Sequence, residues 1–151
     1  MDIRIARATA QDGGKIALIE RDIFSDAWSE RDVVDEICRE VPMCYCAYDG
    51  DELCAYVIGR RIDGEGEIYR VAALPSYRGR GIAKKLITRL TRDEGELGLR
   101  DLYLEVRESN VPARRLYTGC GFKEISKRRN YYKNPSEDAV IMHLALVGEQ
   151  K

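Results

Sequence analysis

The chain has 151 residues and a formal net charge of −1, and 44% of its residues are hydrophobic while 34% are charged. This length predicts a single domain over residues 1–151 that can bury a proper core. The near-neutral balance argues against binding nucleic acid through a globally basic surface, so we expect no direct nucleic-acid recognition. Neither a membrane-spanning run nor a signal-peptide pattern is visible, and we expect a cytoplasmic monomer that does not bind membranes.

The cysteines and the single histidine give no pattern of a metal site. Five cysteines without a paired C-x-x-C spacing predict free, partly buried thiols in a reducing compartment. They are Cys38, Cys44, Cys46, Cys54 and Cys120. His143 lies in an alternating apolar segment, and we interpret it as structural. With one histidine available, we expect no zinc and no other metal cofactor.

The first part of the chain predicts a strand and a helix. Residues 2–5 alternate between charged and apolar side chains, which is typical of a strand. From Asp12 onward, apolar residues recur at helical spacing as far as Ile23. The only tryptophan, Trp28, stands in the break that follows. Trp28 is either an anchor of the core or of a lid, or it borders a substrate groove.

A second helix and a hairpin follow the break. Ser29, three residues before Asp32, predicts an N-terminal cap. We expect the helix to end before Pro42. We expect it to turn four residues inward, namely Val33, Val34, Ile37 and Cys38. Residues 43–49 and 52–61 alternate around an Asp-Gly turn and predict an antiparallel pair of strands.

The central stretch combines a strand, a glycine-rich turn and a helix. The strand at 67–74 ends before Pro75, the turn contains Gly79 and Gly81, and the helix begins near Ile82. A helix start leaves N–H groups without partners and carries the positive end of the dipole, which favours a phosphate or pyrophosphate. The alternative is a plain tight turn. Four nearby cations favour a bound polyanion, namely Arg78, Arg80, Lys84 and Lys85.

This stretch matches neither the Walker pattern nor the three-glycine dinucleotide fingerprint. The helix that follows it has one predicted apolar face. We place six residues on that face, namely Ala83, Leu86, Ile87, Leu90, Glu94 and Leu97.

The second half of the chain supplies candidate acid–base residues. Residues 101–107 alternate cleanly and put Glu105 on the polar face of a strand, and Tyr117 follows on a short helix. A lone acid on a strand is usually only solvated. A carboxylate and a phenol that face one cleft can serve as base and acid. Residues 123–132 and 139–147 predict a last hairpin over the turn 134–138, so the order is βααβββαβαββ.

Several of these motifs resemble one family. Arg78, Gly81 and Ala83 form an Arg-x-x-Gly-x-Ala pattern similar to the acyl-CoA pyrophosphate loop of the GCN5-related N-acetyltransferases (GNAT). Residues 104–110 and 113–122 resemble the second half of these enzymes. Residues 27–30, residues 104–110, and residues 129–132 followed by 137–139 resemble the RimI branch, which acetylates the N-terminal alanine of the eighteenth small-subunit ribosomal protein. The resemblance extends over essentially the whole chain.

The resemblance implies an α+β fold with a seven-stranded, mixed, mostly antiparallel sheet and about four flanking helices. It also implies acetyl-CoA as co-substrate. The backbone of Val71, Ala72 and Ala73 would pair with the pantetheine arm, and Asn110 would add a polar contact. The residues implied at the pyrophosphate are Arg78, Gly79, Arg80, Gly81, Ile82, Ala83 and Lys84.

The implied chemistry is direct attack of an amine on the thioester, with Glu105 as general base and Tyr117 as general acid. Three aromatic residues are implied at the acceptor peptide, namely Trp28, Tyr131 and Tyr132. Two alternatives remain open. One is a broader acetyltransferase acting on protein N-termini, lysines or a small amine, and the other is a non-catalytic acetyl-CoA-binding module.

Two positions depart from the family pattern. Arg70 and Leu74 stand where the family often has a small polar residue and an acid. Arg70 either alters the accepted peptide or only covers the sheet. A basic cluster on the last hairpin is either a solvated face or a surface that attracts a polyanion. Its members are Lys123, Lys127, Arg128, Arg129 and Lys133.

Overall fold

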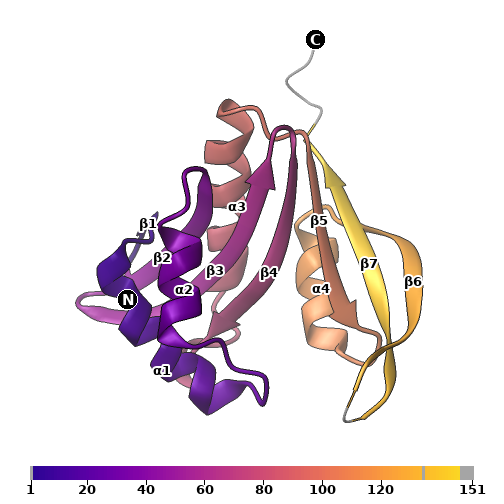
Figure 1. The fold of residues 1–151 in the computed structure, drawn as a ribbon, viewed down its shortest axis with the longest axis horizontal. Coiled ribbons are helices and arrows are strands. Elements are labelled where there is room, and N and C mark those ends of the chain that lie inside the picture. Colours follow the sequence, from indigo (N-terminus) through magenta and orange to yellow (C-terminus); the bar gives the residue numbers. More distant parts are fainter. Residues whose placement is uncertain (1, 134, 147–151) are drawn as a thin grey trace.

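A seven-stranded mixed sheet organises the computed structural model, which describes residues 2–133 and 135–146 (Figure 1). The strands lie in the order β1-β2-β3-β4-β5-β7-β6. Neighbouring strands run antiparallel except β4 and β5, which run parallel. The predicted α+β class and mostly antiparallel sheet are therefore confirmed.

The elements follow the predicted order. The strands are β1 (Ile3–Arg7), β2 (Pro42–Asp49), β3 (Glu52–Ile62), β4 (Glu65–Ala73), β5 (Asp101–Arg107), β6 (Lys123–Tyr132) and β7 (Glu137–Ala145). The helices are α1 (Gly13–Ile23), α2 (Glu30–Ile37), α3 (Ile82–Glu96) and α4 (Val111–Gly119), with 3₁₀ turns at Ala10–Asp12 and Pro75–Tyr77. Within the described ranges, none of the helices is long and apolar enough to span a membrane. Asn134 of the predicted last turn and Val147 of the predicted last strand lie outside the described residues.

Helices cover both faces of the sheet (Figure 1). The front face, as we call it, carries α1 and α2, whose apolar residues Ile16 and Val33 pack on Cys44 and Tyr56 of the strands. The back face carries α3 and α4, and Leu86 and Tyr117 belong to its apolar cluster. Apolar side chains at helical spacing thus bury one stripe of each helix, which is the main driving force for this layering. All five cysteines are free and three are buried, as predicted.

Two residues expected to face inward lie in solvent instead. Cys38 and Leu97 are both exposed. The cause is the same in each case, because α2 ends at Ile37 and α3 ends at Glu96. One residue past a helix end, the chain changes direction and the 3.6-residue periodicity no longer applies.

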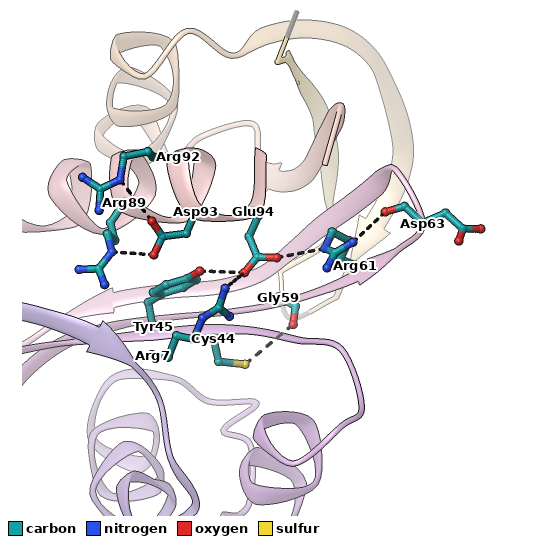
Figure 2. A network of polar contacts seen from close by, with 10 residues as sticks. All are labelled: Arg7, Cys44, Tyr45, Gly59, Arg61, Asp63, Arg89, Arg92, Asp93 and Glu94. Atoms are coloured by element: carbon teal, nitrogen blue, oxygen red, sulfur yellow. Dashed lines mark hydrogen bonds and ion pairs between the residues drawn. The ribbon is translucent and has the colours of Figure 1, made fainter. Parts of the chain in front are cut away.

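A buried carboxylate fastens α3 to the back of the sheet (Figure 2). Glu94 has no exposed surface, and it accepts a hydrogen bond of 2.7 Å from the Tyr45 hydroxyl. Arg7 and Arg61 form ion pairs with the same carboxylate at 2.9 and 3.0 Å. Its three partners come from β1, β2 and β3, so one side chain ties three strands to one helix. A buried charge is tolerated when it is paired and hydrogen-bonded in this way.

The pairing of β4 with β5 stops halfway along β4. Paired residues run from Glu65 with Asp101 to Ile68 with Leu104, and residues 70–73 pair with β3 alone. The break coincides with a bulge at Tyr69, since Gly59 of β3 pairs with Ile68 while Ile58 pairs with Arg70. A bulge bends a strand and increases its twist, which turns β4 away from β5.

Candidate active site

The glycine turn after β4 has the geometry of an anion cradle. Gly79 and Gly81 have φ values of +76° and +78°, in the left-handed region that residues with a side chain rarely adopt. Gly81 is the N-cap of α3 and, as a glycine, has no side chain that could cap the first N–H groups of the helix. The space around both glycines is open, with no heavy atom within 4 Å of an added Cβ. The first N–H groups of α3 therefore face open space with the positive end of the helix dipole.

Nearby side chains hold this turn in place. Arg78 Nε donates to the Ala73 carbonyl at 3.1 Å. The Arg80 guanidinium lies over the Tyr77 ring, 5.5 Å from its centroid. The Tyr77 hydroxyl donates to the carboxylates of Asp49 at 2.9 Å and Glu52 at 2.8 Å, so the turn is tied to the β2–β3 connection. Arg78, Arg80, Lys84 and Lys85 are all exposed, which leaves the surface of the turn rich in cations.

A pocket of about 320 Å³ lies on the front face where β4 leaves β5. Its lining residues are Arg60, Ile62, Glu65, Gly66, Glu67, Tyr69, Tyr103, Leu104, Glu105 and Ile141. Carboxylate and aromatic side chains from two neighbouring strands therefore meet at one opening. This composition suits a cationic or amine-bearing acceptor.

Glu105 is held in this pocket by residues of β6. Its side chain is 18% exposed, and its Oε2 accepts a hydrogen bond of 2.8 Å from Arg128 Nη1. A hydrogen bond to Glu105 also raises the pKa of Tyr131. The Arg128 guanidinium stacks on the Tyr131 ring at 4.3 Å. The carboxylate is thus oriented while one edge still faces the pocket.

Sequence reasoning missed Glu65 and Glu67, two further carboxylates of the same pocket. Burial, followed by the negative charge of Glu105, raises the pKa of Glu67. The alternation of Glu65 and Glu67 before Ile68 was the available signal. The sequence predicted a strand that starts at Glu67, whereas β4 already begins at Glu65.

Tyr117 lies on the other side of β5 from Glu105. The phenol is 8% exposed and belongs to the back-face cluster, where its ring meets Phe122 edge-on at 5.8 Å. Burial raises the pKa of Tyr117 to about 12. Tyr132 interacts electrostatically with both residues. Burial, followed by the charge of Glu105, raises the pKa of Tyr132 to about 12. Tyr132 in turn contributes to the raised pKa of Tyr117. The Glu105 and Tyr117 side chains thus lie on opposite faces of the sheet, near the point where the pairing of β4 with β5 ends.

The remaining predicted residues border these features. The Trp28 ring lies against Tyr69 with centroids 6.1 Å apart. Tyr131 and Tyr132 meet edge-on at 5.2 Å at the end of β6. Asn110 caps α4, since its Oδ1 accepts the Ala113 N–H at 3.2 Å. In the part of the chain that is described, no group of three or more His, Cys, Asp or Glu side chains is placed to hold a metal ion.

The break in the sheet, the glycine turn and the open start of α3 are the features expected of an acyl-CoA-dependent N-acetyltransferase. Comparison with known protein families confirms this class. The sequence profile of the Acetyltransferase (GNAT) family matches residues 15–122, and the chain belongs to this family. The predicted family and the predicted acetyltransferase activity are thus both supported.

Its relatives include two enzymes that carry one name. The ribosomal protein bS18-alanine N-acetyltransferase of Haemophilus ducreyi is 39% identical over 99 residues, which cover 64% of this chain and 68% of the relative. The enzyme of that name from Escherichia coli K12 is 31% identical over 130 residues, covering 85% and 87%. The crystal structure of the ribosomal-protein-S18-alanine N-acetyltransferase from Escherichia coli superposes with a TM-score of 0.88 at 28% identity, covering 99% of both chains.

Proposed function

We propose that this protein transfers an acetyl group from acetyl-CoA to the N-terminal α-amine of a protein, with the N-terminal alanine of ribosomal protein bS18 as its acceptor. The observation that carries the proposal is the position of Glu105, which lines the front pocket at the point where β4 leaves β5. The relatives of 31–39% identity support the acceptor, since their names specify alanine of bS18.

The chain's own residues fit acetyl-CoA. Beyond Ile68, the edge of β4 that faces β5 has no strand partner. On that edge, backbone groups of Val71, Ala72 and Ala73 are available to the amides of a pantetheine arm. The open glycine turn and the first turn of α3 fit a pyrophosphate. The residues proposed there are Arg78, Gly79, Arg80, Gly81, Ile82, Ala83 and Lys84. Asn110, at the start of α4, would add a polar contact.

Glu105 and Tyr117 would divide the proton transfers. The acceptor amine loses a proton to Glu105, directly or through one water, and attacks the thioester carbonyl. The pKa of a free N-terminal amine is about 8, so a modest base suffices at neutral pH. The new C–N bond forms as the C–S bond breaks, and the Tyr117 hydroxyl gives its proton to the leaving thiolate. With a pKa of about 12, this phenol keeps its proton at neutral pH.

The acceptor would reach the front pocket between the loop of Trp28 and the end of β6. Trp28 contacts Tyr69 at the pocket wall, while Tyr131 contacts Glu105 from the other side. Tyr132 lies next to Tyr131 and completes an aromatic boundary. Aromatic walls suit an extended peptide end, because they offer rigid apolar contact area at low entropic cost.

Mass spectrometry after incubation with acetyl-CoA tests the reaction and the acceptor together. The mixture contains the alanine-starting N-terminal peptide of bS18, the same peptide with a blocked N-terminus, and a lysine-rich peptide. We expect acetylation of the free alanine amine alone. Acetylated lysines or equal acetylation of many N-termini would replace the narrow acceptor by a broader one. Acetyl-CoA binding without any transfer would contradict the enzymatic proposal for these acceptors.

Two variants test the residue roles. Glu105→Gln should lower kcat by about a hundredfold or more, and acetyl-CoA affinity should stay near the wild-type value. Tyr117→Phe should slow the chemical step in single-turnover measurements. Glu108→Gln is the matched control, because Glu108 follows β5 and pairs with Lys127 of β6 at 2.6 Å, as Glu105 pairs with Arg128. A collapse of affinity with unchanged turnover would refute the role of Glu105, and a wild-type rate in Tyr117→Phe would refute that of Tyr117.

A further inference from the structure

A second fully buried carboxylate lies under the front-face helices, and the proposed chemistry does not use it. Glu20 of α1 has no exposed surface. It accepts hydrogen bonds from the Tyr56 hydroxyl at 2.6 Å and from the Trp28 backbone N–H at 3.0 Å. Arg70 reaches it with Nε at 3.1 Å and Nη2 at 3.0 Å. One carboxylate thus joins helix α1, strands β3 and β4, and the segment that precedes α2.

Arg70 contacts this segment, residues 24–28, at several further points. We call residues 24–28 the acceptor loop. Arg70 Nη2 donates to the Asp26 carbonyl at 3.0 Å and to the Asp26 carboxylate at 3.3 Å. Its guanidinium lies over the Phe24 ring at 3.7 Å. Although Arg70 sits on the sheet, its side chain is only 13% exposed. A planar guanidinium with several donors can hold a loop in this way, and a lysine cannot reproduce it fully.

The bulge of β4 gives Arg70 its direction. Ile68 belongs to the back-face cluster, whereas Ala72 belongs to the front-face cluster. The unpaired residue Tyr69 between them shifts the alternation, so that Arg70 points to the front. Arg70, which contacts the acceptor loop, is therefore the direct neighbour in sequence of Tyr69, which lines the front pocket. The loop in turn places the Trp28 ring against Tyr69.

We propose that Arg70 is a positioning residue that holds the acceptor loop against β4 and thereby determines which peptide the front pocket accepts. The proposal rests on the proposed function, because it takes the front pocket as the entrance of the acceptor amine. Arg70 acts through Glu20, Phe24 and Asp26 and does not touch the reacting groups. Its loss should change peptide recognition far more than binding of acetyl-CoA.

The chain offers a closely matched control on the opposite face. Arg61 also has a side chain that is 13% exposed, and its partner Glu94 is also fully buried. The hydrogen bonds of Arg61 go to Glu94 and to the Asp63 carbonyl, both away from the acceptor loop. Arg70→Met leaves Glu20 without its arginine, whereas Arg61→Met removes one of the two arginines of Glu94 and leaves Arg7 in place. The two variants also differ in whether the lost arginine holds a loop.

The first measurement is the fluorescence of Trp28, which is the only tryptophan of the chain and lies in the acceptor loop. We expect Arg70→Met to increase quenching of Trp28 by acrylamide, whereas Arg61→Met should leave quenching at the wild-type level. Arg70→Lys, which keeps a cation beside Glu20, should lie between them and guards against a methionine variant that does not fold. Equal quenching in the wild type, Arg70→Met and Arg70→Lys would overturn the proposal.

The second measurement is the steady-state kinetics of the same variants. Arg70→Met should raise KM for the bS18 peptide about tenfold, with KM for acetyl-CoA close to wild type. Equal effects of Arg70→Met and Arg61→Met on peptide KM would overturn the proposal. The quenching measurement needs no acceptor, so it decides whether Arg70 holds the loop even if the wild type leaves the peptide unacetylated. That last outcome would contradict the proposed function alone.

Discussion

Glu20 and Glu94 have the same surroundings in chemical terms and opposite places in the molecule. Each carboxylate is fully buried, each accepts a tyrosine hydroxyl from a strand, and each pairs with an arginine whose side chain is 13% exposed. The partners of Glu94 all come from strands β1, β2 and β3 (Figure 2). Glu20 differs in that it also accepts the Trp28 N–H, which belongs to a loop.

The comparison shows how one arrangement can serve two purposes. At Glu94 the polar contacts connect elements that hydrogen bonds and apolar packing already hold, so their contribution is to the stability of the fold. At Glu20 they hold a segment without regular secondary structure against the strand that borders the front pocket. Loops have few other contacts of their own, so a buried charge pair can determine their conformation.

The largest expected effect is on stability and comes from Glu94. Glu94→Gln leaves Arg61 buried without its charge partner, and we expect a loss of about 3 kcal/mol in the free energy of unfolding. Urea denaturation measures this loss. Under conditions where the variant is folded, KM for peptide and for acetyl-CoA should match the wild type. A selective change in peptide KM would contradict the division between the two carboxylates.

Alkaline pH should weaken both regions together. Burial, followed by the hydrogen bond to a carboxylate, raises the pKa of Tyr45 and of Tyr56 above the usual value near 10. The folded state therefore keeps these protons longer than the unfolded state, so stability is fully present below about pH 10 and falls as the pH rises further. The fall is at most about 1.4 kcal/mol per pH unit for each phenol.

Urea denaturation between neutral pH and pH 11 measures this slope. Tyr45→Phe and Tyr56→Phe should each have a shallower decline than the wild type, because each lacks one of the two phenols. Identical slopes in the wild type and in both variants would show that these phenols are not responsible for the decline.

The smallest expected effect comes from Arg92, which pairs with the sequence neighbour of Glu94. Asp93 pairs with Arg92 at 3.2 Å on the surface of α3, and the Arg92 side chain is 65% exposed (Figure 2). Arg92→Ala should change the free energy of unfolding by less than about 0.5 kcal/mol, because water solvates the Arg92 guanidinium and Asp93 keeps its ion pair with Arg89. Urea denaturation beside Glu94→Gln provides the comparison. A loss as large as that of Glu94→Gln would mean that burial does not explain the difference.

Local patterns predicted the parts of the structure that depend on neighbouring residues. The alternation in residues 101–107 placed Leu104 and Val106 in the core and Glu105 on the other face, as observed. The cap at Ser29 was predicted from its spacing to Asp32, and its side chain accepts the Asp32 N–H. The glycine turn was predicted because left-handed backbone conformations favour glycine, and Gly79 and Gly81 have such conformations.

The helical pattern placed Glu94 on the buried face of its helix, but it predicted neither the partners of Glu94 nor the burial of Glu20. The partners of Glu20 on the sheet, Tyr56 and Arg70, lie 36 and 50 residues away in the sequence. An acid within an amphipathic helix is normally solvated, and only the tertiary structure reveals an exception. The bulge at Tyr69 added a second difficulty, because one unpaired residue exchanges the two faces of a strand. The sequence therefore left the role of Arg70 undecided between peptide selection and covering the sheet.

The short pairing of β4 with β5 has a mechanical consequence. Strand pairing joins the two parts of the sheet only from Glu65 with Asp101 to Ile68 with Leu104. This short paired segment would act as a pivot, and the lengths of β4 and β5 beyond it, which do not pair with each other, are the two arms. Arg70 and the acceptor loop lie on one arm, and Glu105 with Arg128 lies on the other. A small rotation about the pivot produces a displacement that grows along the arms. A ligand between the arms would therefore set the separation between the acceptor loop and Glu105.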